Sequence, residues 1–513
     1  MVTYIVRRLF TAVLILLGAS FLVYQLTALS GDPLADLRTS NQPNKEELIQ
    51  QRIELLDLNV PAPVRYFHWL GGAAKCLVPF VGQCDLGFSI TGQPVTEALG
   101  RAMGMTILLV SAAAILAVLI GVSLGIVTAL RQYSTLDYGV TFMAFLFFSL
   151  PVFWVAVLLK EYVAIGFNNF LREPQIPLVT IIIVSVVSGL IWFICARGTV
   201  LVRLKAAGIG LVLAGGVLWL LSATSWFSSP GLGLPVIAVA GAGVAFGATL
   251  LTAGLKNRRA LYSSLTMVAV GIVLYFPIQP LLAQATGLMI FLLAVATILV
   301  GLGVGYVMGG YDRRQNMSAA VITSFLTAGL VLLDRYMQAW PAYFNNNRVN
   351  GRPIATIGAE TPNLEGDFWV HGLDTFTHLL LPTIALLLIS LASYSRYSRS
   401  SMLEIMNMDY IRTARAKGLG ERTVVMRHAF RNALIPIATI VAYDIGGLIG
   451  GAVITERVFA FAGMGQLFIQ ALDRVDPNPV MGVFLVTGVL ALVFNLIADL
   501  VYSALDPRVR VKA

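Results

Sequence analysis

The chain has 513 residues, of which 58% are hydrophobic and only 12% are charged. Soluble domains carry about twice that charged share, so the composition excludes a soluble enzyme and a disordered protein. Three cysteines are too few for a disulfide scaffold. The formal charge of +9 is more typical of basic cytoplasmic loops in a membrane protein than of a nucleic-acid binder, and we expect no nucleic-acid partner.

Long apolar runs predict membrane-spanning helices, because a bilayer span takes about 20 residues. We therefore predict an all-α polytopic membrane protein with about 12 transmembrane helices. The runs are Leu9 to Ala28, Met105 to Leu130, Val140 to Phe167, Pro177 to Ala196, Ala206 to Leu221, Leu234 to Leu255, Leu261 to Leu282, Leu288 to Met308, Ala319 to Leu333, Phe376 to Ala392, Leu434 to Ile454 and Val480 to Ser503.

The first apolar run is longer than the roughly 7–15 residues of a signal-peptide core, so we expect a retained anchor. The polar segment 30–102 follows it and has room for a small folded extracellular element. Cys76 and Cys84 lie in this segment, in a compartment where disulfides persist. They form either a disulfide or two unlinked thiols, because sequence does not show whether their Cβ atoms lie close enough.

Basic residues indicate the orientation. With alternating sides across twelve spans, the clusters ICARGTVLVRLK, LKNRRA and YDRR all fall on the same side as the N-terminus. The terminal Arg508, Arg510 and Lys512 fall there too. The positive-inside rule then predicts that both termini are cytoplasmic. The stretch from Asp334 to Asp374, with NNNRVNGRP, is interpreted as an irregular outer loop.

The segment 396–433 is long, basic and, in this topology, cytoplasmic. Gly418-Leu-Gly420 interrupts helix-forming residues, which predicts two helices joined at a glycine turn against the inner face of the membrane. Two roles remain open from composition. The segment either offers a docking surface or is held by anionic lipid head groups.

The sequence DYIRTARAKGL, followed by RHAFRNALIP, resembles the coupling loop of permeases in ABC importers for dipeptides, oligopeptides and nickel. Further matching stretches occur in the family's order and cover about residues 1–170 and 372–513. They are YIVRRLF with a later GDPL, CDLGFSI, LDTFTHLLLPTIAL, TERVFAFAGMGQLFIQAL and NLIADLVYSALDPRVR. CDLGFSI departs from the usual Gly-Asp-Leu-Gly of the family.

The resemblance implies a six-helix type I importer core that is split by an insertion. Residues 1–170 would form its first half, with three spans, and 374–513 its second half, with the coupling loop 396–433. The block 171–373 would add about six spans and an extracellular loop. Its role is open: a lipid-facing layer, a partner-binding module or a stabiliser of the outer loops.

The resemblance also implies partners. Such a permease forms the translocation pathway with a second permease subunit, and two ATP-binding subunits dock on the pair. An extracellular substrate-binding protein delivers the substrate, most often a di- or oligopeptide, across the cell membrane of a prokaryote. The chain has no G-x-x-x-x-G-K-[ST] loop, so ATP and Mg would be bound by the partner ATPases and no cofactor by this chain.

By position, Arg412, Thr413 and Ala414 occupy the Glu-Ala-Ala place of the general importer motif, but no Glu is present. The distance from Gly418 to Pro436 also exceeds the general pattern, and peptide-type permeases share both departures. Arg415 and Lys417 would pair either with acids of an ATPase or with lipid phosphates. The predicted ATPase-docking residues are Arg412, Thr413, Ala414, Arg415, Ala416, Lys417 and Gly418.

Asp444 lies in the glycine-rich span VAYDIGGLIGGAV. An intramembrane acid is a functional candidate, so Asp444 either lines the pathway and meets a peptide amino group or accepts a hydrogen bond within the bundle. No metal site is predicted, because the four histidines show no ligand spacing: His68, His371, His378 and His428. No catalytic or cofactor site is predicted either, because the sequence has no nucleophile motif and no paired-carboxylate signature. The rival functions are a self-sufficient secondary transporter and a membrane-embedded lipid-modifying enzyme.

Overall fold

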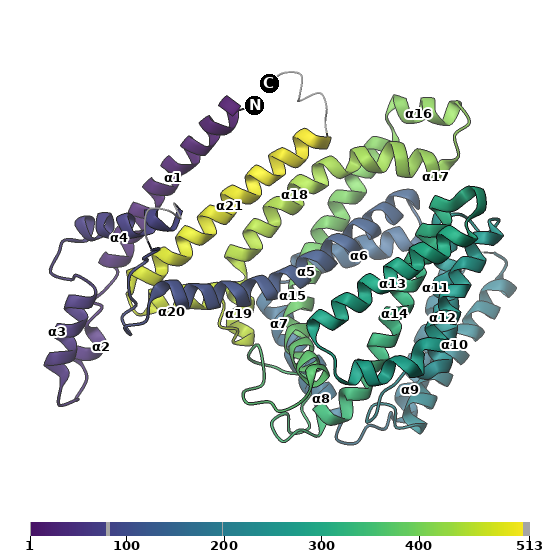
Figure 1. Cartoon of the computed structure of the whole chain (residues 1–513), viewed down its shortest axis with the longest axis horizontal. Helices are drawn as coiled ribbons and strands as arrows, with labels where there is room; N and C mark the ends of the chain where they lie inside the picture. Colours follow the sequence, from purple (N-terminus) through teal and green to yellow (C-terminus); the bar gives the residue numbers. More distant parts are fainter. Residues whose placement is uncertain (1, 78–82, 197, 506–513) are drawn as a thin grey trace. The chain divides into compact units, whose positions relative to one another are not determined.

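The computed structural model describes residues 2–77, 83–196 and 198–505 (Figure 1). Over these residues the chain is helical, and its single isolated β-bridge joins Phe88 and Pro94. Eleven helices are long and apolar enough to cross a bilayer, or twelve if one bent pair counts as a span. The predicted all-α polytopic fold with about twelve spans is therefore confirmed. Arg197, Arg508, Arg510 and Lys512, which the topology prediction used, lie outside the described residues.

The chain divides into two compact units. The first comprises Met1–Ala164, Thr356–Ala359 and His378–Ala513, and the second comprises Ile165–Ala355 and Glu360–Thr377. The long helix α15 contributes to both units. The helices of the first unit are α1 (Val2–Leu29), α2 (Ala35–Arg38), α3 (Lys45–Leu55), α4 (Ala62–Leu77), α5 (Val95–Leu130), α6 (Thr135–Ser149), α7 (Val152–Leu158), the π-helix η1 (Leu159–Ile165), α15 (Phe368–Met406), α16 (Asp409–Ala416), α17 (Glu421–Thr423), the π-helix η3 (Val424–Ala429), α18 (Phe430–Gly451), α19 (Val453–Phe459), α20 (Met464–Asp473) and α21 (Pro477–Leu505).

In the first unit, α21 lies between α1 and α18 (Figure 1). An apolar cluster joins α1 and α4 to α5, α20 and α21, with Tyr24, Trp69 and Met481 among its buried members. Ser20 of α1 and Tyr66 of α4 share a buried hydrogen bond of 2.8 Å between their hydroxyl oxygens. The amphipathic helix α4 is thus fixed on the first span.

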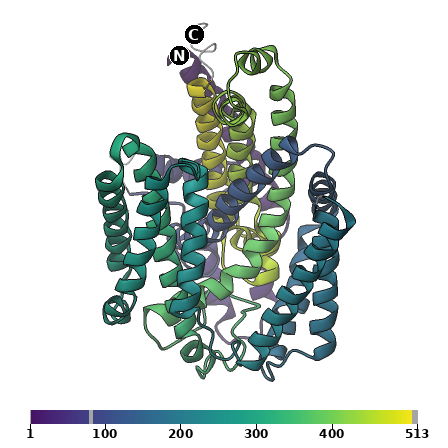
Figure 2. The same cartoon turned by 90° about the vertical axis from the view of Figure 1, so that its right-hand side faces the viewer.

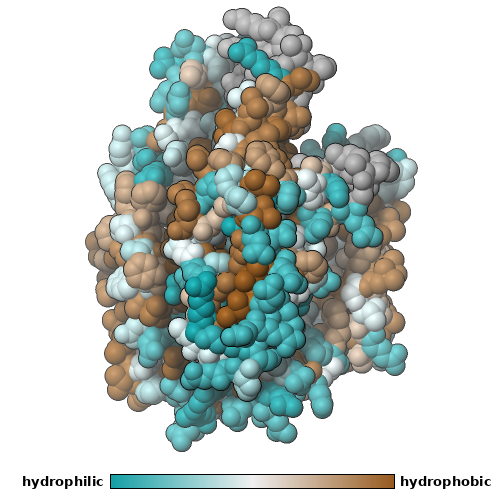
Figure 3. Space-filling model, turned by 90° about the vertical axis from the view of Figure 1, so that its left-hand side faces the viewer, coloured by the Kyte–Doolittle hydropathy of each residue, from teal (hydrophilic) through white to brown (hydrophobic). Residues whose placement is uncertain are grey.

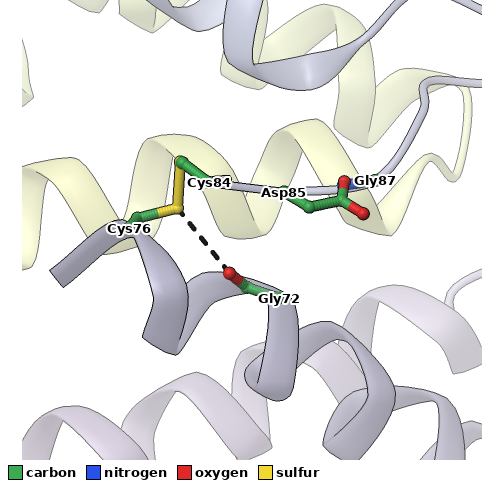
Figure 4. Close-up of a disulfide and its surroundings, with 5 residues drawn as sticks. All are labelled: Gly72, Cys76, Cys84, Asp85 and Gly87. Atoms are coloured by element: carbon green, nitrogen blue, oxygen red, sulfur yellow. Dashed lines mark hydrogen bonds between the residues drawn. A yellow bond between two sulfur atoms is a disulfide. The ribbon is translucent and has the colours of Figure 1, made fainter. Parts of the chain in front are cut away.

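The segment after α1 folds into α2, α3 and α4. Cys76 in the last turn of α4 is joined to Cys84 by a disulfide (Figure 4). The chain then turns at Asp85, whose carboxylate accepts from the backbone N–H of Gly87 (2.9 Å). On the face drawn in Figure 3, hydrophilic side chains gather over α2 and α3, whereas α1 presents hydrophobic ones.

The predicted span Val140 to Phe167 is not one straight helix. It consists of α6 and a second run, Thr135–Ser149 and Val152–Phe170, and the two are bent by 103° at Leu150 and Pro151. Leu150 has an extended backbone, with φ −83° and ψ 129°. A residue before proline disfavours the helical region, and proline lacks the N–H that would continue the helical hydrogen bonds. Hydropathy, which ignores this effect, shows only a continuous apolar run.

In the second unit, α9 and α10 pack against each other, and α11 to α14 form a bundle (Figure 2). The core of the second unit includes Ile237, Tyr275, Leu282, Tyr343 and, from the start of α15, Trp369. The helices are α8 (Gly166–Phe170), α9 (Leu178–Cys195), α10 (Val200–Ala223), α11 (Gly233–Thr252), α12 (Arg258–Ala283), α13 (Gly287–Met308), the short 3₁₀ helix η2 (Gly310–Asp312) and α14 (Arg313–Phe344).

The predicted outer loop from Asp334 to Asp374 is helical at both ends, because α14 extends to Phe344 and α15 begins at Phe368. Both of its terminal acids are buried rather than loop residues. Asp334 accepts from the backbone N–H groups of Leu232 (2.7 Å) and Gly233 (3.0 Å), and so caps α11. Hydropathy underestimates α14 because polar side chains lie on its core-facing side.

Candidate coupling site and pathway residues

The basic segment between α15 and α18 folds around α16. α15 ends at Met406, α16 follows as a separate short helix, and the chain re-enters helical structure at Glu421 (Figure 1). Between the two helices Gly418 has φ +76°, in the left-handed region that favours glycine. The turn is therefore built on a residue without a Cβ.

One face of α16 is buried. Ile411 and Ala414 pack into an apolar cluster with Met402 of α15, Val424 of η3 and Ala433 of α18. Ala129, at the end of α5, belongs to the same cluster. Ile411 and Ala414 are three residues apart, so they share one helical face. The result is a short helix whose position is fixed by three long helices at once.

The opposite face of α16 and the following turn are exposed. The exposed members of the predicted docking set are Arg412, Thr413, Arg415, Ala416, Lys417 and Gly418. Ala414 differs from them, since it is 6% exposed and points into the cluster. It is a packing residue that holds the helix, because a side chain directed inward does not reach a partner surface.

Arg415 pairs within its own chain. Its guanidinium contacts both carboxylate oxygens of Glu421, at 2.6 Å and 3.1 Å, across the glycine turn. The Arg415 guanidinium lowers the pKa of Glu421 below its usual value. The sequence-based interpretation paired Arg415 either with acids of an ATPase or with lipid phosphates, and did not foresee an acid of the same chain. A pair six residues apart across a turn has no helical spacing that would reveal it.

Asp444 lies on α18 and is held by α15. Its Oδ2 accepts from the hydroxyl of Tyr394 (2.6 Å) and from that of Ser390 (3.1 Å). The next residue, Ile445, lines an apolar cavity of about 490 Å³ between α5, α18 and α21. The Asp444 carboxylate is therefore hydrogen-bonded within the bundle, and Asp444 itself is not among the residues that line this cavity.

Two buried acids of the first unit are not predicted from the sequence. Glu456 of α19 accepts from the Thr106 hydroxyl of α5 (2.6 Å), and burial raises its pKa. Asp476, before α21, accepts from the backbone N–H of Ile90 (2.7 Å), and burial raises its pKa to about 6. Their partners lie hundreds of residues away, so no local pattern could indicate the contacts.

Over the part of the chain that the structure describes, no three His, Cys, Asp or Glu side chains cluster as metal ligands would. Two other features are candidates for a function: the exposed face of α16 and the polar group around Asp444. Both lie in the first unit, and α15 contributes to each.

The chain is similar in sequence to known transport permeases. Residues 354–511 match the model of the binding-protein-dependent transport system inner membrane component family. The chain is 34% identical over 247 residues to the oligopeptide transport system permease protein OppB of Mycobacterium tuberculosis (strain ATCC 25618 / H37Rv), covering 46% of this chain and 74% of OppB. It is 25% identical over 512 residues to AppB, an oligopeptide transport system permease protein of Bacillus subtilis (strain 168), with 99% of each chain covered.

A third relative is the dipeptide transport system permease protein DppB of Escherichia coli (strain K12), 44% identical over 140 residues, which are 27% of this chain and 41% of DppB. The fold defines a polytopic helical membrane protein, and its relatives are transport permeases. The chain belongs to the family of binding-protein-dependent transport system inner membrane components.

Proposed function

We propose that this chain is a transmembrane permease subunit of an ATP-driven importer of di- or oligopeptides. It would form the translocation pathway with a second permease subunit, receive substrate from an extracellular binding protein and dock an ATP-binding subunit on α16. Two ATP-binding subunits would serve the complete importer and bind its ATP and Mg. The named functions of the related OppB, AppB and DppB support the peptide as substrate class.

The observation that supports this proposal most strongly is the packing of α16 against three long helices. Its exposed face carries Arg412, Thr413 and Lys417, while Ile411 and Ala414 fix the helix to α5, α15 and α18. A force applied to the exposed face would reach three long helices through one apolar cluster. A loop that merely rests on lipid head groups needs no such rigid attachment.

The proposed orientation places α16 in the cytoplasm, together with both termini. This segment, 396–433, contains the basic residues Arg396, Arg399, Arg412, Arg415 and Lys417. The positive-inside rule favours the cytoplasmic side for such a segment. ATP-binding subunits work in that compartment, so the orientation and the docking role are mutually consistent.

Two glycines in the turn permit a matched test. Gly418 has φ +76°, whereas Gly420 has φ −60°, and an added Cβ at either meets no atom within 4 Å. A side chain at position 418 therefore strains the backbone of the turn, whereas one at position 420 does not, and neither added Cβ clashes. We expect Gly418→Leu to reduce both co-purification of the ATP-binding subunit and peptide uptake, and Gly420→Leu to retain both. Full assembly and transport by Gly418→Leu would refute docking at this turn.

A further inference from the structure

An ion pair between a buried carboxylate and a partly exposed guanidinium connects α6 to α15 in the first unit. Arg399 donates from Nε to Oδ1 of Asp137 (2.7 Å) and from Nη2 to Oδ2 (3.0 Å). The Asp137 side chain is 3% exposed and that of Arg399 is 29% exposed. Two parallel bonds between a guanidinium and a carboxylate fix both distance and orientation. This pair therefore sets the position of one helix relative to the other.

Asp137 is itself held in place at the start of α6. Its Oδ2 also accepts from the backbone N–H of Tyr133 (3.0 Å), and the Ser134 hydroxyl accepts from the Asp137 N–H (3.2 Å). The carboxylate thus ties the turn before α6, the first turn of α6 and α15 together. Removing the guanidinium would leave the Asp137 carboxylate buried without its ion-pair partner, which is unfavourable.

A second contact joins the same two helices. The guanidinium of Arg396 lies 4.4 Å from the ring centre of Phe148, near the other end of α6. Along α6, Asp137 and Phe148 are separated by about 16 Å at the helical rise per residue. Arg396 and Arg399, less than one turn apart on α15, therefore contact both ends of α6, and α6 can follow α15 as a unit.

Helix α5 contacts this part of α15 at backbone distance. A Cβ added to Gly125 would lie 2.5 Å from the carbonyl oxygen of Ser395 and 2.9 Å from the backbone nitrogen of Arg399. Close packing of this kind requires the glycine, as in other membrane helix pairs. From Arg399, α15 continues for two turns to Met406 and leads directly into α16.

The half of the span beyond the bend is attached elsewhere. Lys160 in η1 donates from Nζ to the backbone carbonyl of Val458 in α19 (3.1 Å), and its ammonium group lies 5.9 Å from the ring centre of Phe459. The bent span is thus held by α15 on one side of Pro151 and by α19 on the other. A shift of α15 would change the bend at Leu150 and Pro151.

We propose that Asp137 and Arg399 are positioning residues for energy coupling, passing the displacement of α15 and α16 to the bent span α6–α7. This inference rests on the proposed function, since it assumes that an ATP-binding subunit moves α16. The pair acts through the helices it joins and does not itself contact substrate or nucleotide. The ion pair stays formed while α15 moves, and so keeps α6 in a fixed position relative to α15.

The test uses the full importer in proteoliposomes and compares peptide uptake with ATP hydrolysis. The variants are Asp137→Asn, Arg399→Lys, and the exchanged pair Asp137→Arg with Arg399→Asp. The control is Arg38→Gln, which breaks the exposed pair between Arg38 and Asp32. We expect Asp137→Asn to keep its ATP-binding subunits and to lose about tenfold in uptake per ATP hydrolysed, since the loss of a hydrogen bond between charged groups changes an equilibrium by about that factor.

Arg399→Lys keeps the positive charge but loses the two parallel N–H donors of the guanidinium, so its loss of uptake per ATP should be intermediate. The exchanged pair should recover part of the uptake. Arg38→Gln should leave the ratio unchanged. Equal losses of assembly, hydrolysis and uptake, without recovery in the exchanged pair, would show a merely structural pair and overturn the inference. An unchanged ratio in Asp137→Asn would also overturn it. Failure of the proposed function would instead appear in the unaltered chain, as absence of ATP-dependent uptake.

Discussion

At the scale of single residues, the hydrogen bonds of Asp444 distinguish between its two possible roles, lining the pathway and holding helices together. Its carboxylate accepts from Tyr394 and Ser390, and the Tyr394 side chain is 1% exposed. The tyrosine hydroxyl needs an acceptor there, because a buried hydroxyl without a partner costs about 1–3 kcal/mol. The contacts favour a role in holding α18 to α15 over a role in binding substrate.

We predict that Asp444→Asn retains thermal stability and peptide uptake, because the amide oxygen still accepts from Tyr394. Asp444→Ala should lose about 1–3 kcal/mol of stability, the cost of the unpartnered hydroxyl. Thermal unfolding in detergent and uptake at matched expression measure the two effects. Loss of uptake in a stable Asp444→Asn variant would show that the negative charge serves the pathway.

Asp476 gives a pH dependence. Burial raises its pKa to about 6 in the folded chain, and an unfolded aspartate has a value near 3.9. The folded form therefore binds the proton more tightly, and stability decreases as pH rises through this interval, by up to about 1.4 kcal/mol per pH unit. The loss comes from keeping the charged carboxylate out of water, because the hydrogen bond from the Ile90 N–H itself favours the charged form. Opening of the loop that contains Ile90 would hydrate the carboxylate, so this loop should open more readily at higher pH.

We predict that amide hydrogen exchange in residues 85–94, corrected for the intrinsic rate, is slower at pH 5 than at pH 7. Asp476→Asn should abolish the difference while keeping the loop docked, because asparagine carries an acceptor oxygen and does not titrate in this range. A pH effect that persists in Asp476→Asn, or one of the opposite sign, would contradict this assignment.

At the scale of elements, the stability of α16 depends on its buried face. Ile411 is fully buried and contacts the cluster that includes Met402 and Val424, whereas Leu419 in the turn is 40% exposed. We predict that Ile411→Ala destabilises the segment by about 2–4 kcal/mol, the usual loss for a large buried aliphatic side chain. Leu419→Ala should have a much smaller effect.

Limited proteolysis between residues 407 and 423, together with co-purification of the ATP-binding subunit, measures this difference. Ile411→Ala should be cleaved faster and retain less partner, and Leu419→Ala should behave like the unaltered chain. Equal behaviour of the two variants would mean that the cluster does not position α16.

The positions of the spans could be predicted from the sequence, whereas their bends and caps could not. Apolar runs located the spans because bilayer thickness fixes their length. They missed the bend at Pro151, which depends on backbone geometry, and they placed Asp334 in a loop although it caps α11. Within the coupling segment the glycine turn was foreseeable from residue type. The pairing of Arg415 with Glu421 was not, because it depends on how the turn folds back.

At the scale of the whole molecule, the first unit carries the residues proposed to couple and to transport. It contains α16, Asp444 and the pair of Asp137 with Arg399, and α15 contacts all three. The described part of the second unit has its own core around Tyr343 and Trp369. Sequence resemblance predicted an inserted block over 171–373, and its role is a separate question from the coupling proposed for the first unit.

The central claim is that this chain transports peptide only as part of an ATP-driven complex. The most direct measurement purifies the tagged chain from cells that express its native partners and reconstitutes it with labelled peptide. We predict that a second permease and ATP-binding subunits co-purify, and that peptide accumulates only when ATP and a binding protein are both supplied. Peptide accumulation by the chain alone, driven by an ion gradient without any ATP-binding subunit, would contradict the account.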